Sequence, residues 1–289
     1  MDGLVADLRE GQAKLRRKAN QDPRIIGCAD ALARLEARMV EKSRVIVLGE
    51  GNVGKTSLVN LLLDQILLPE SVLANTRRPV VLRFAQSFVV IGVTPFRRLD
   101  LEYGDIDPRH ASSLLRLEVG LPNPRLASFD LVDTPALSTS EQLEPLQLGA
   151  ADLLLWCTVA TQAWKESERR LWMIIGKRHR QRAILVATHR DSLRNDDDRN
   201  RIWARLTAET ADCFSAIVFV CASSRGGSLR REDSGAGELD ALIASSLSTM
   251  TQQRCRAGYR LANCIVAQAL KRIEAGRDNM ALPIDESSS

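Results

Sequence analysis

The middle of the chain alternates short, continuous apolar runs with longer stretches in which apolar residues recur at helical spacing. Short β-branched runs predict buried strands, and the helical apolar period predicts helices. The expected strands cover residues 44–48, Val80–Phe84, Phe88–Val93, Leu114–Val119, Phe129–Val132, 153–157, Ala183–Ala187 and Ala216–Cys221. The expected helices cover residues 55–66, Glu166–Lys177 and Asp198–Thr210. This alternation predicts an α/β fold with a mostly parallel sheet and helices on both faces.

Both ends of the chain carry apolar stripes at helical spacing without any expected strand. The N-terminal stripes are Leu4, Leu8 and Leu15, followed by Leu32, Leu35 and Met39. After Ser223–Gly237, whose composition predicts a flexible loop, apolar faces follow at Leu239–Met250 and Tyr259–Ile273. Because such stripes need a surface that covers them, we predict that the two ends pack on each other as a helical neck.

Composition is that of an ordinary globular protein and excludes several classes. Of the 289 residues, 45% are hydrophobic and 26% charged, and a net charge of +4 does not by itself indicate a nucleic-acid partner. Six cysteines without a C-x-x-C pair and three histidines predict free thiols in a reducing compartment and no zinc site. The polar N-terminus predicts no signal peptide, and no apolar run is long enough for a transmembrane segment. We therefore expect a cytoplasmic protein, for which peripheral membrane contact stays open.

The apolar run Val45–Leu48 leads into G-E-G-N-V-G-K-T, which matches the phosphate-binding loop and precedes a helical pattern. Its glycines let backbone N–H groups surround a di- or triphosphate, and the helix N-terminus adds partial positive charge. Lys55 is placed to reach the β- and γ-phosphates, and the Thr56 hydroxyl to ligate Mg²⁺. The expected nucleotide-binding residues are Gly49, Glu50, Gly51, Asn52, Val53, Gly54, Lys55, Thr56 and Ser57. A glycine turn that matches by coincidence is the alternative.

Three later strand ends supply the other parts of a nucleotide site. Asp133 ends an apolar run and can hold Mg²⁺ directly or through water, although Asp-Thr-Pro also suits a simple turn. In T-H-R-D, Thr188 follows a strand and Asp191 can accept hydrogen bonds from guanine, which would select GTP over ATP. A solvated helix cap is the alternative for Asp191. Ala222 and Ser223 can offer backbone N–H groups to the base carbonyl.

The order of these motifs resembles the GTPase head of the dynamin superfamily in its bacterial form. Beyond the phosphate-binding loop, the resemblance is carried by S-L-V-N-L-L-L at 57–63, L-L-P at 67–69 and A-N-T-R-R-P at 74–79. It covers about residues 44–225, and the flanking helices resemble the neck of that family. The expected organisation is N-terminal neck helices at 1–43, a GTPase domain at 44–237, a C-terminal neck helix at 238–278 and a disordered tail at 279–289.

The resemblance implies a P-loop GTPase that binds GTP and GDP, uses Mg²⁺ and hydrolyses GTP. On this basis Lys55, Thr76 and Asp133 are catalytic, and Thr56, Thr76 and Asp133 serve the metal. Thr76 would be the switch threonine that places the attacking water, with an ordinary loop threonine as the alternative. The resemblance also implies a homodimer, or a related GTPase as partner, that meets this head through the nucleotide face. We expect no long stalk.

Three residues depart from the family pattern. Ala136 replaces the glycine after the Asp133 motif, His189 replaces the lysine of the guanine motif, and Glu50 occupies a position that often places a catalytic water. These departures leave open a nucleotide-binding switch or scaffold that hydrolyses little. An Era-like GTPase that acts on RNA is a third hypothesis, but the sequence shows no RNA-binding module, so we expect no nucleic-acid partner.

Two basic segments remain outside the nucleotide site. Residues 177–182 contain several cations directly before an expected strand. Residues 250–277 contain five arginines and one lysine, and Glu274 is the single acidic residue among them. The second segment could contact anionic lipid or an acidic partner. A solvated helix face is the alternative.

Overall fold

The computed structural model describes residues 2–19, 23–65, 78–101, 113–143, 146, 148, 151–193, 195–221 and 234–280, with only the backbone of Arg24 and of residues 276–280. The chain divides into two compact units. A helical unit comprises Met1–Glu41 and Ser248–Ser289, and a sheet unit comprises Lys42–Leu247. The functional boundaries of a neck and a GTPase domain stay a prediction.

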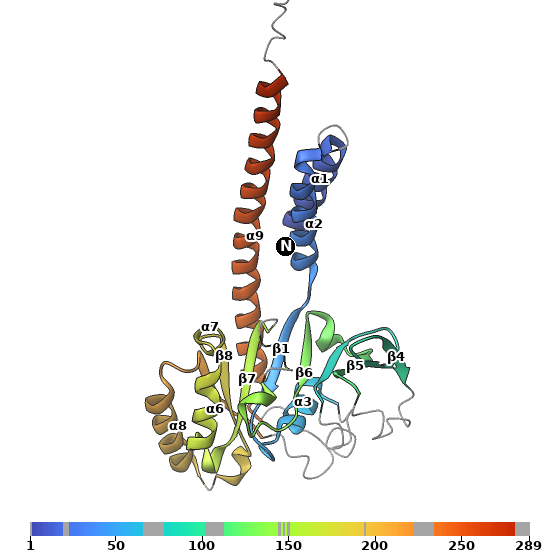
Figure 1. Ribbon diagram of the computed structural model, residues 1–289. Helices are drawn as coiled ribbons and strands as arrows, with labels where there is room; N and C mark the ends of the chain where they lie inside the picture. Colours follow the sequence, from blue (N-terminus) through green and yellow to red (C-terminus); the bar gives the residue numbers. More distant parts are fainter. Residues whose placement is uncertain are drawn as a thin grey trace, which may run out of the picture. The chain divides into compact units, whose positions relative to one another are not determined.

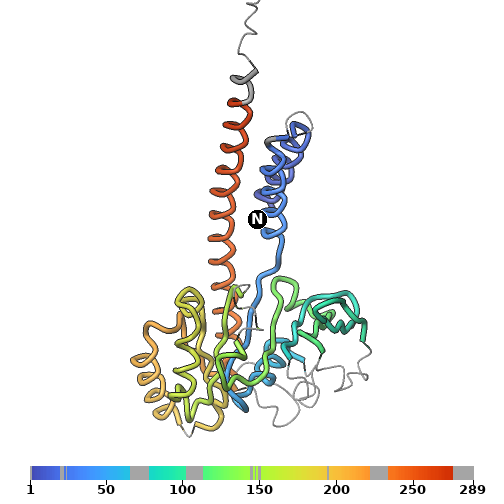
Figure 2. The backbone as a smooth tube through the Cα atoms, viewed as in Figure 1, coloured from blue at the N-terminus to red at the C-terminus, as the bar shows by residue number. Residues whose placement is uncertain are grey.

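The helical unit is built from amphipathic helices. These are α1 (Asp2–Ala19), the short η1 (Pro23–Ile25), α2 (Ile26–Val40) and the later part of α9 (Ala236–Met280). Figure 2 shows α1 and α2 folded back on each other. Their predicted stripes meet α9 in one apolar cluster, which contains Leu4, Leu8, Leu32, Leu35, Met39, Ile265 and Ala269. The predicted mutual burial of the stripes is confirmed for this part of α9, whereas Leu239 and Ile243 belong to the sheet unit.

The sheet unit contains a nine-stranded sheet among the described residues, in the order β4-β3-β5-β2-β6-β1-β7-β8-β9 (Figure 1). The strands are β1 (Ser43–Leu48), β2 (Val80–Phe84), β3 (Val89–Val93), β4 (Arg98–Leu101), β5 (Arg116–Leu121), β6 (Phe129–Asp133), β7 (Leu153–Val159), β8 (Ala183–Thr188) and β9 (Ala216–Phe219). The flanking helices are α3 (Lys55–Leu63), α6 (Glu166–Ile174), α7 (Lys177–Arg180) and α8 (Asp196–Thr210). Short 3-10 turns join several of them, including η2 (Pro124–Ala127), η6 (Ala160–Gln162) and η7 (Arg190–Ser192).

The predicted mostly parallel α/β sheet is confirmed, with one antiparallel region. Strands β6, β1, β7, β8 and β9 run parallel, as do β2 and β5, whereas β2 opposes β6 and β3 opposes both β4 and β5. The sequence pattern missed β4, because its residues alternate between exposed and half-buried positions at the sheet edge. β5 and β6 follow each other in the chain but do not pair, because β2 lies between them.

Two predicted helices were too long. The expected helix 55–66 ends at Leu63 as α3, and Asp64 follows it with a left-handed φ of +54°. The expected helix Glu166–Lys177 is divided, since α6 ends at Ile174 and Gly176 precedes α7 with an extended backbone (φ −59°, ψ 143°). The short basic helix α7 therefore lies between the end of α6 and the start of β8 in the chain.

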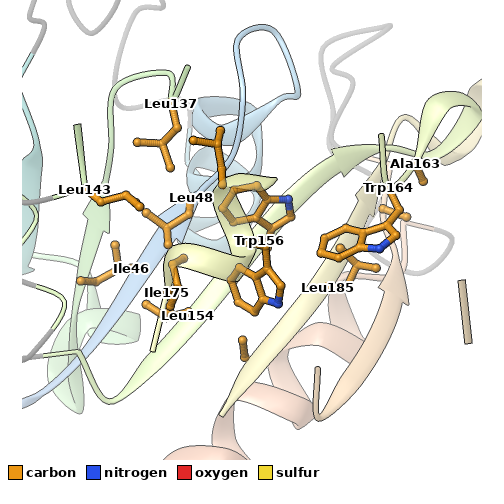
Figure 3. Close-up of a cluster of buried hydrophobic side chains, with 14 of the residues drawn as sticks. Ile46, Leu48, Leu137, Leu143, Leu154, Trp156, Ala163, Trp164, Ile175 and Leu185 are labelled. Carbon is orange, nitrogen blue, oxygen red and sulfur yellow. The ribbon is translucent and has the colours of Figure 1, made fainter. Parts of the chain in front are cut away.

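The core of the sheet unit lies around the central strands. Ile46 and Leu48 of β1, Leu154 and Trp156 of β7 and Leu185 of β8 are fully or almost fully buried (Figure 3). Continuous apolar runs such as these are expected for parallel strands that are covered on both faces. The three neighbouring rings Trp156, Trp164 and Trp172 also belong to this core, and the Trp172 ring stacks on Phe214 with centroids 4.4 Å apart.

Candidate nucleotide-binding site

The phosphate-binding loop connects β1 to α3 in the arrangement that the sequence predicts. Gly49 leaves the strand with φ at +150°, and a Cβ atom there would lie 2.6 Å from the carbonyl oxygen of Cys157 on β7. Gly54 has φ at +79° directly before Lys55, the first residue of α3. Glycine alone suits these two positions, because side chains rarely adopt such angles and Gly49 has no room for one.

The ammonium group of Lys55 lies inside this loop. Its Nζ donates hydrogen bonds to the backbone oxygens of Gly49, at 3.1 Å, and Glu50, at 2.6 Å. The side chain is buried, and burial lowers the pKa of Lys55. The loop carbonyls therefore hold a cation at the position where the motif requires one for the β- and γ-phosphates.

A carboxylate at the end of β6 completes the centre of the site. The Thr56 hydroxyl donates to Oδ2 of Asp133 at 2.9 Å, and the second carboxylate oxygen, Oδ1, is buried without a hydrogen-bond partner. Burial raises the pKa of Asp133 to about 6, against the opposing effects of the Thr56 hydrogen bond and the Lys55 charge. An unpaired buried carboxylate oxygen beside a hydroxyl fits Mg²⁺ or one of its waters. Thr56 and Asp133 are thus close together, as the predicted metal set of Thr56, Thr76 and Asp133 requires of these two residues.

We expect Asp133→Asn to stabilise the nucleotide-free protein at neutral pH by about 1–3 kcal/mol while weakening Mg·GTP binding. A carboxyl whose pKa is raised on folding makes the folded state less stable as pH rises from about 4 to about 6, because the folded state then holds its proton more tightly. Asparagine has the same shape and cannot ionise. Urea unfolding across this pH range measures the effect, with Asp197→Asn on exposed α8 as the matched control. Identical pH dependence of wild type and Asp133→Asn would contradict the assignment.

The loop after β6 stays close to the phosphate-binding loop. Leu137 donates its backbone N–H to the Gly49 oxygen at 3.1 Å, and a Cβ atom at Gly51 would lie 3.8 Å from the Cβ of Ala136. Ala136 is thus placed beside the loop in spite of its replacement of the family's glycine.

The end of β8 is tied to the phosphate-binding loop. The Thr188 hydroxyl lies 2.8 Å from the Val53 oxygen and 3.0 Å from the Thr158 oxygen, so it can donate to either. His189 follows in the left-handed region (φ +55°), and its Nε2 lies 3.5 Å from the position of a Cβ atom on Gly54. The imidazole therefore lies beside the loop at the position where the family pattern has a lysine.

Asp191 lies on η7, directly after this strand end, with an exposed side chain. The η7 turn is held beside the end of β9, because the backbone N–H of Arg190 donates to the Val220 oxygen at 3.1 Å. The structure thus brings residues 49–57, Asp133 and Thr188 together and places Asp191 on the adjacent loop. Thr76, Ala222 and Ser223 lie outside the described residues.

Sequence reasoning missed a buried hydrogen-bond group that joins the end of β7 to the start of α6. Glu168 accepts from the Thr158 hydroxyl and from the Lys165 backbone N–H, both at 2.9 Å, and burial raises its pKa. Trp164 in this loop has a left-handed φ of +63°, which is rare for a large side chain. The signal available in the sequence was a glutamate three residues into a helix, the spacing at which a side chain caps the helix start.

Fold and site together define a P-loop GTP-binding domain. The model of the 50S ribosome-binding GTPase family matches residues 44–189, and the chain belongs to this family. Dynamin-like protein 2 of Campylobacter jejuni is 31% identical over 140 residues, which make up 43% of this chain and 22% of that protein. Two solved chains of an oligomerised bacterial dynamin pair superpose with TM-scores of 0.63 and 0.61 at 16% identity, each over 96% of this chain and over 48% and 57% of their own length.

These comparisons confirm the resemblance to the GTPase head of bacterial dynamin-like proteins. The structural likeness extends over the flanking helices as well as the sheet, although at 16% identity it concerns the fold alone. The chain spans less than a quarter of the curated relative that it matches. Among the described helices, none carries an apolar stretch that could cross a bilayer.

Proposed function

We propose that this head hydrolyses GTP to GDP and phosphate with the help of Mg²⁺. The observation that carries the proposal is the contact between the Thr56 hydroxyl and the buried Asp133 carboxylate, directly beside the Lys55 ammonium. Calorimetric binding of GTP, GDP and ATP, followed by a phosphate-release assay, tests it. Binding of GTP without phosphate release would favour the switch or scaffold hypothesis, which Ala136 and His189 support.

The mechanism follows from the positions of these groups. Water attacks the γ-phosphorus in line with the bond to the β-phosphate, and that bond breaks as the new one forms. Lys55 and the backbone N–H groups of the phosphate-binding loop neutralise charge that develops on the phosphate oxygens. Thr56 and Asp133 would hold Mg²⁺, which supplies further positive charge to the phosphates when bound. Asp191 would bind the guanine base. The Thr188 hydroxyl, at the end of the strand that precedes Asp191, would tie this strand end to the phosphate-binding loop through the Val53 oxygen.

We expect Thr76→Ala to abolish turnover while GTP still binds. The family resemblance assigns this threonine to the placement of water and Mg²⁺ in the reacting state, so its loss removes an interaction that binding does not need. Single-turnover phosphate release and GTP affinity, measured on the same preparation, separate the two effects. Thr207→Ala, at an exposed position of α8, is the matched control. Robust turnover by Thr76→Ala would move the switch assignment elsewhere, with Thr94 as the next candidate.

The partner that we propose is a second GTPase head, either a copy of this chain or a relative. The supporting likeness is to chains described as an oligomerised bacterial dynamin pair. Specific activity that rises with protein concentration is the expected result, and light scattering with and without a GTP analogue measures the assembly. All six cysteines are free, which agrees with the proposed reducing, cytoplasmic location.

A further inference from the structure

The first basic segment singled out in the sequence lies on a corner that the nucleotide site does not use. Strands β1, β7 and β8 run parallel, and the phosphate-binding loop follows the end of β1. Helix α7 directly precedes the start of β8, so it lies at the opposite end of these strands (Figure 1). A ligand at this corner would leave the nucleotide site accessible.

Two adjacent apolar side chains protrude from the corner. Met173 and Ile174, at the end of α6, are 56% and 57% exposed. The Arg180 guanidinium contacts the Met173 sulfur, with Nη1 and Sδ 2.8 Å apart, so α7 is held against the end of α6. Gly176, between the two helices, has open space at its Cβ position. The apolar pair is therefore accessible and held next to α7.

Positive charge predominates in the segment that carries this pair. Residues 165–182 contain lysine or arginine at positions 165, 169, 170, 177, 178, 180 and 182 and carboxylates only at 166 and 168. Glu168 is buried, and Glu166 pairs with Arg170 at 3.2 Å. Within the part of the chain that the structure describes, Lys177 and Arg178 form no ion pair, and both are exposed. Burial, and after it the charges of Arg178 and Arg182, lower the pKa of His179.

We propose that Met173, Ile174, Lys177 and Arg178, here called the α6–α7 corner, bind the surface of an anionic lipid membrane. Aliphatic side chains that enter the headgroup region beside lysine and arginine are typical of peripheral membrane contacts. RNA recognition would use exposed aromatic side chains for stacking, and the corner has none. A stable protein interface needs about 1,000 Å² with anchoring side chains, which two aliphatic residues do not supply.

Flotation of the full chain with phosphatidylcholine vesicles, with and without phosphatidylserine, tests the proposal. We expect binding only with phosphatidylserine, and weaker binding at high salt because the charges are exposed. Lys177→Glu/Arg178→Glu should lower the bound fraction roughly tenfold or more, since each cation near an anionic surface contributes separately. Met173→Ser/Ile174→Ser should lower it as well, without a change in overall charge.

Arg256→Glu/Arg260→Glu, on the second basic segment, is the matched control with the same charge change. We expect it to retain vesicle binding, and all variants to keep wild-type GDP affinity, which reports folding. Wild type that does not bind the vesicles, corner variants that bind like wild type, or an equal loss in the α9 control would each overturn the proposal. Binding of single-stranded RNA that the corner variants lose, without vesicle binding, would assign the surface to RNA instead.

Discussion

Replacement of Lys55 by alanine is expected to weaken Mg·GTP binding at least tenfold, a loss of about 1.4 kcal/mol or more. The reason is local, because Lys55 is the one side-chain cation that the motif places against the β- and γ-phosphates. In the structure its ammonium is buried among loop carbonyls, which makes it available to phosphate oxygens without a long movement. Calorimetric titration with GTP in the presence of Mg²⁺ measures the loss.

The nucleotide-free protein should remain folded when Lys55 is replaced by alanine. Alanine removes a buried cation whose pKa burial already lowers, so the folded state loses little stability. Lys14→Ala, on the helical unit, removes the same charge from an exposed position and should leave GTP affinity unchanged. Unchanged affinity in folded Lys55→Ala would show that this loop is not the phosphate site.

The second large effect concerns the choice of base. We expect Asp191→Asn to weaken GTP binding roughly a hundredfold, since hydrogen bonds to a charged group contribute about 1.5–3 kcal/mol each. Xanthine nucleotides should bind the variant better than wild type, because their edge presents a carbonyl where guanine has an amino group and therefore suits an amide. Competition between GTP, xanthosine triphosphate and ATP measures the change in relative affinity for the three nucleotides.

Asp197→Asn provides the comparison for this test, because it makes the same change on the first turn of α8. It should leave all three affinities as they are in wild type. Equal affinity of the wild-type protein for GTP and ATP would end the guanine assignment of Asp191. Phosphate binding by the loop would not be affected by that result, because the Lys55 experiment tests it separately.

The sequence predicts the part of the site that depends on local geometry. A strand, a glycine loop and a helix must follow one another for Lys55 and Thr56 to meet phosphates, so the motif fixes their positions. Asp133 was predictable because the carboxyl ends of neighbouring parallel strands lie at one edge of a sheet, and β1 pairs with β6. Thr188 stays a predicted nucleotide contact, and its hydroxyl lies within hydrogen-bond distance of the Val53 and Thr158 backbone oxygens.

What the sequence did not predict depends on contacts between distant segments. The position of β2 between β5 and β6 follows from long-range pairing, which a local apolar pattern does not encode. The contact of the Cys157 carbonyl with Gly49 arises only when β7 lies beside β1. The Glu168–Thr158 hydrogen bond likewise joins a helix to a strand. The sequence around either residue does not indicate that the two side chains meet.

The cluster of tryptophans gives the protein an optical probe of its own. The Trp172 ring lies 5.2 Å from that of Trp156 and 6.5 Å from that of Trp164, centroid to centroid, so three of the four tryptophans share one environment. Trp156 lies in β7, next to β1, and Trp164 lies in the loop that follows this strand. Ultraviolet emission from this group should respond when a nucleotide shifts that loop, so association and release can be followed in stopped flow without any attached dye.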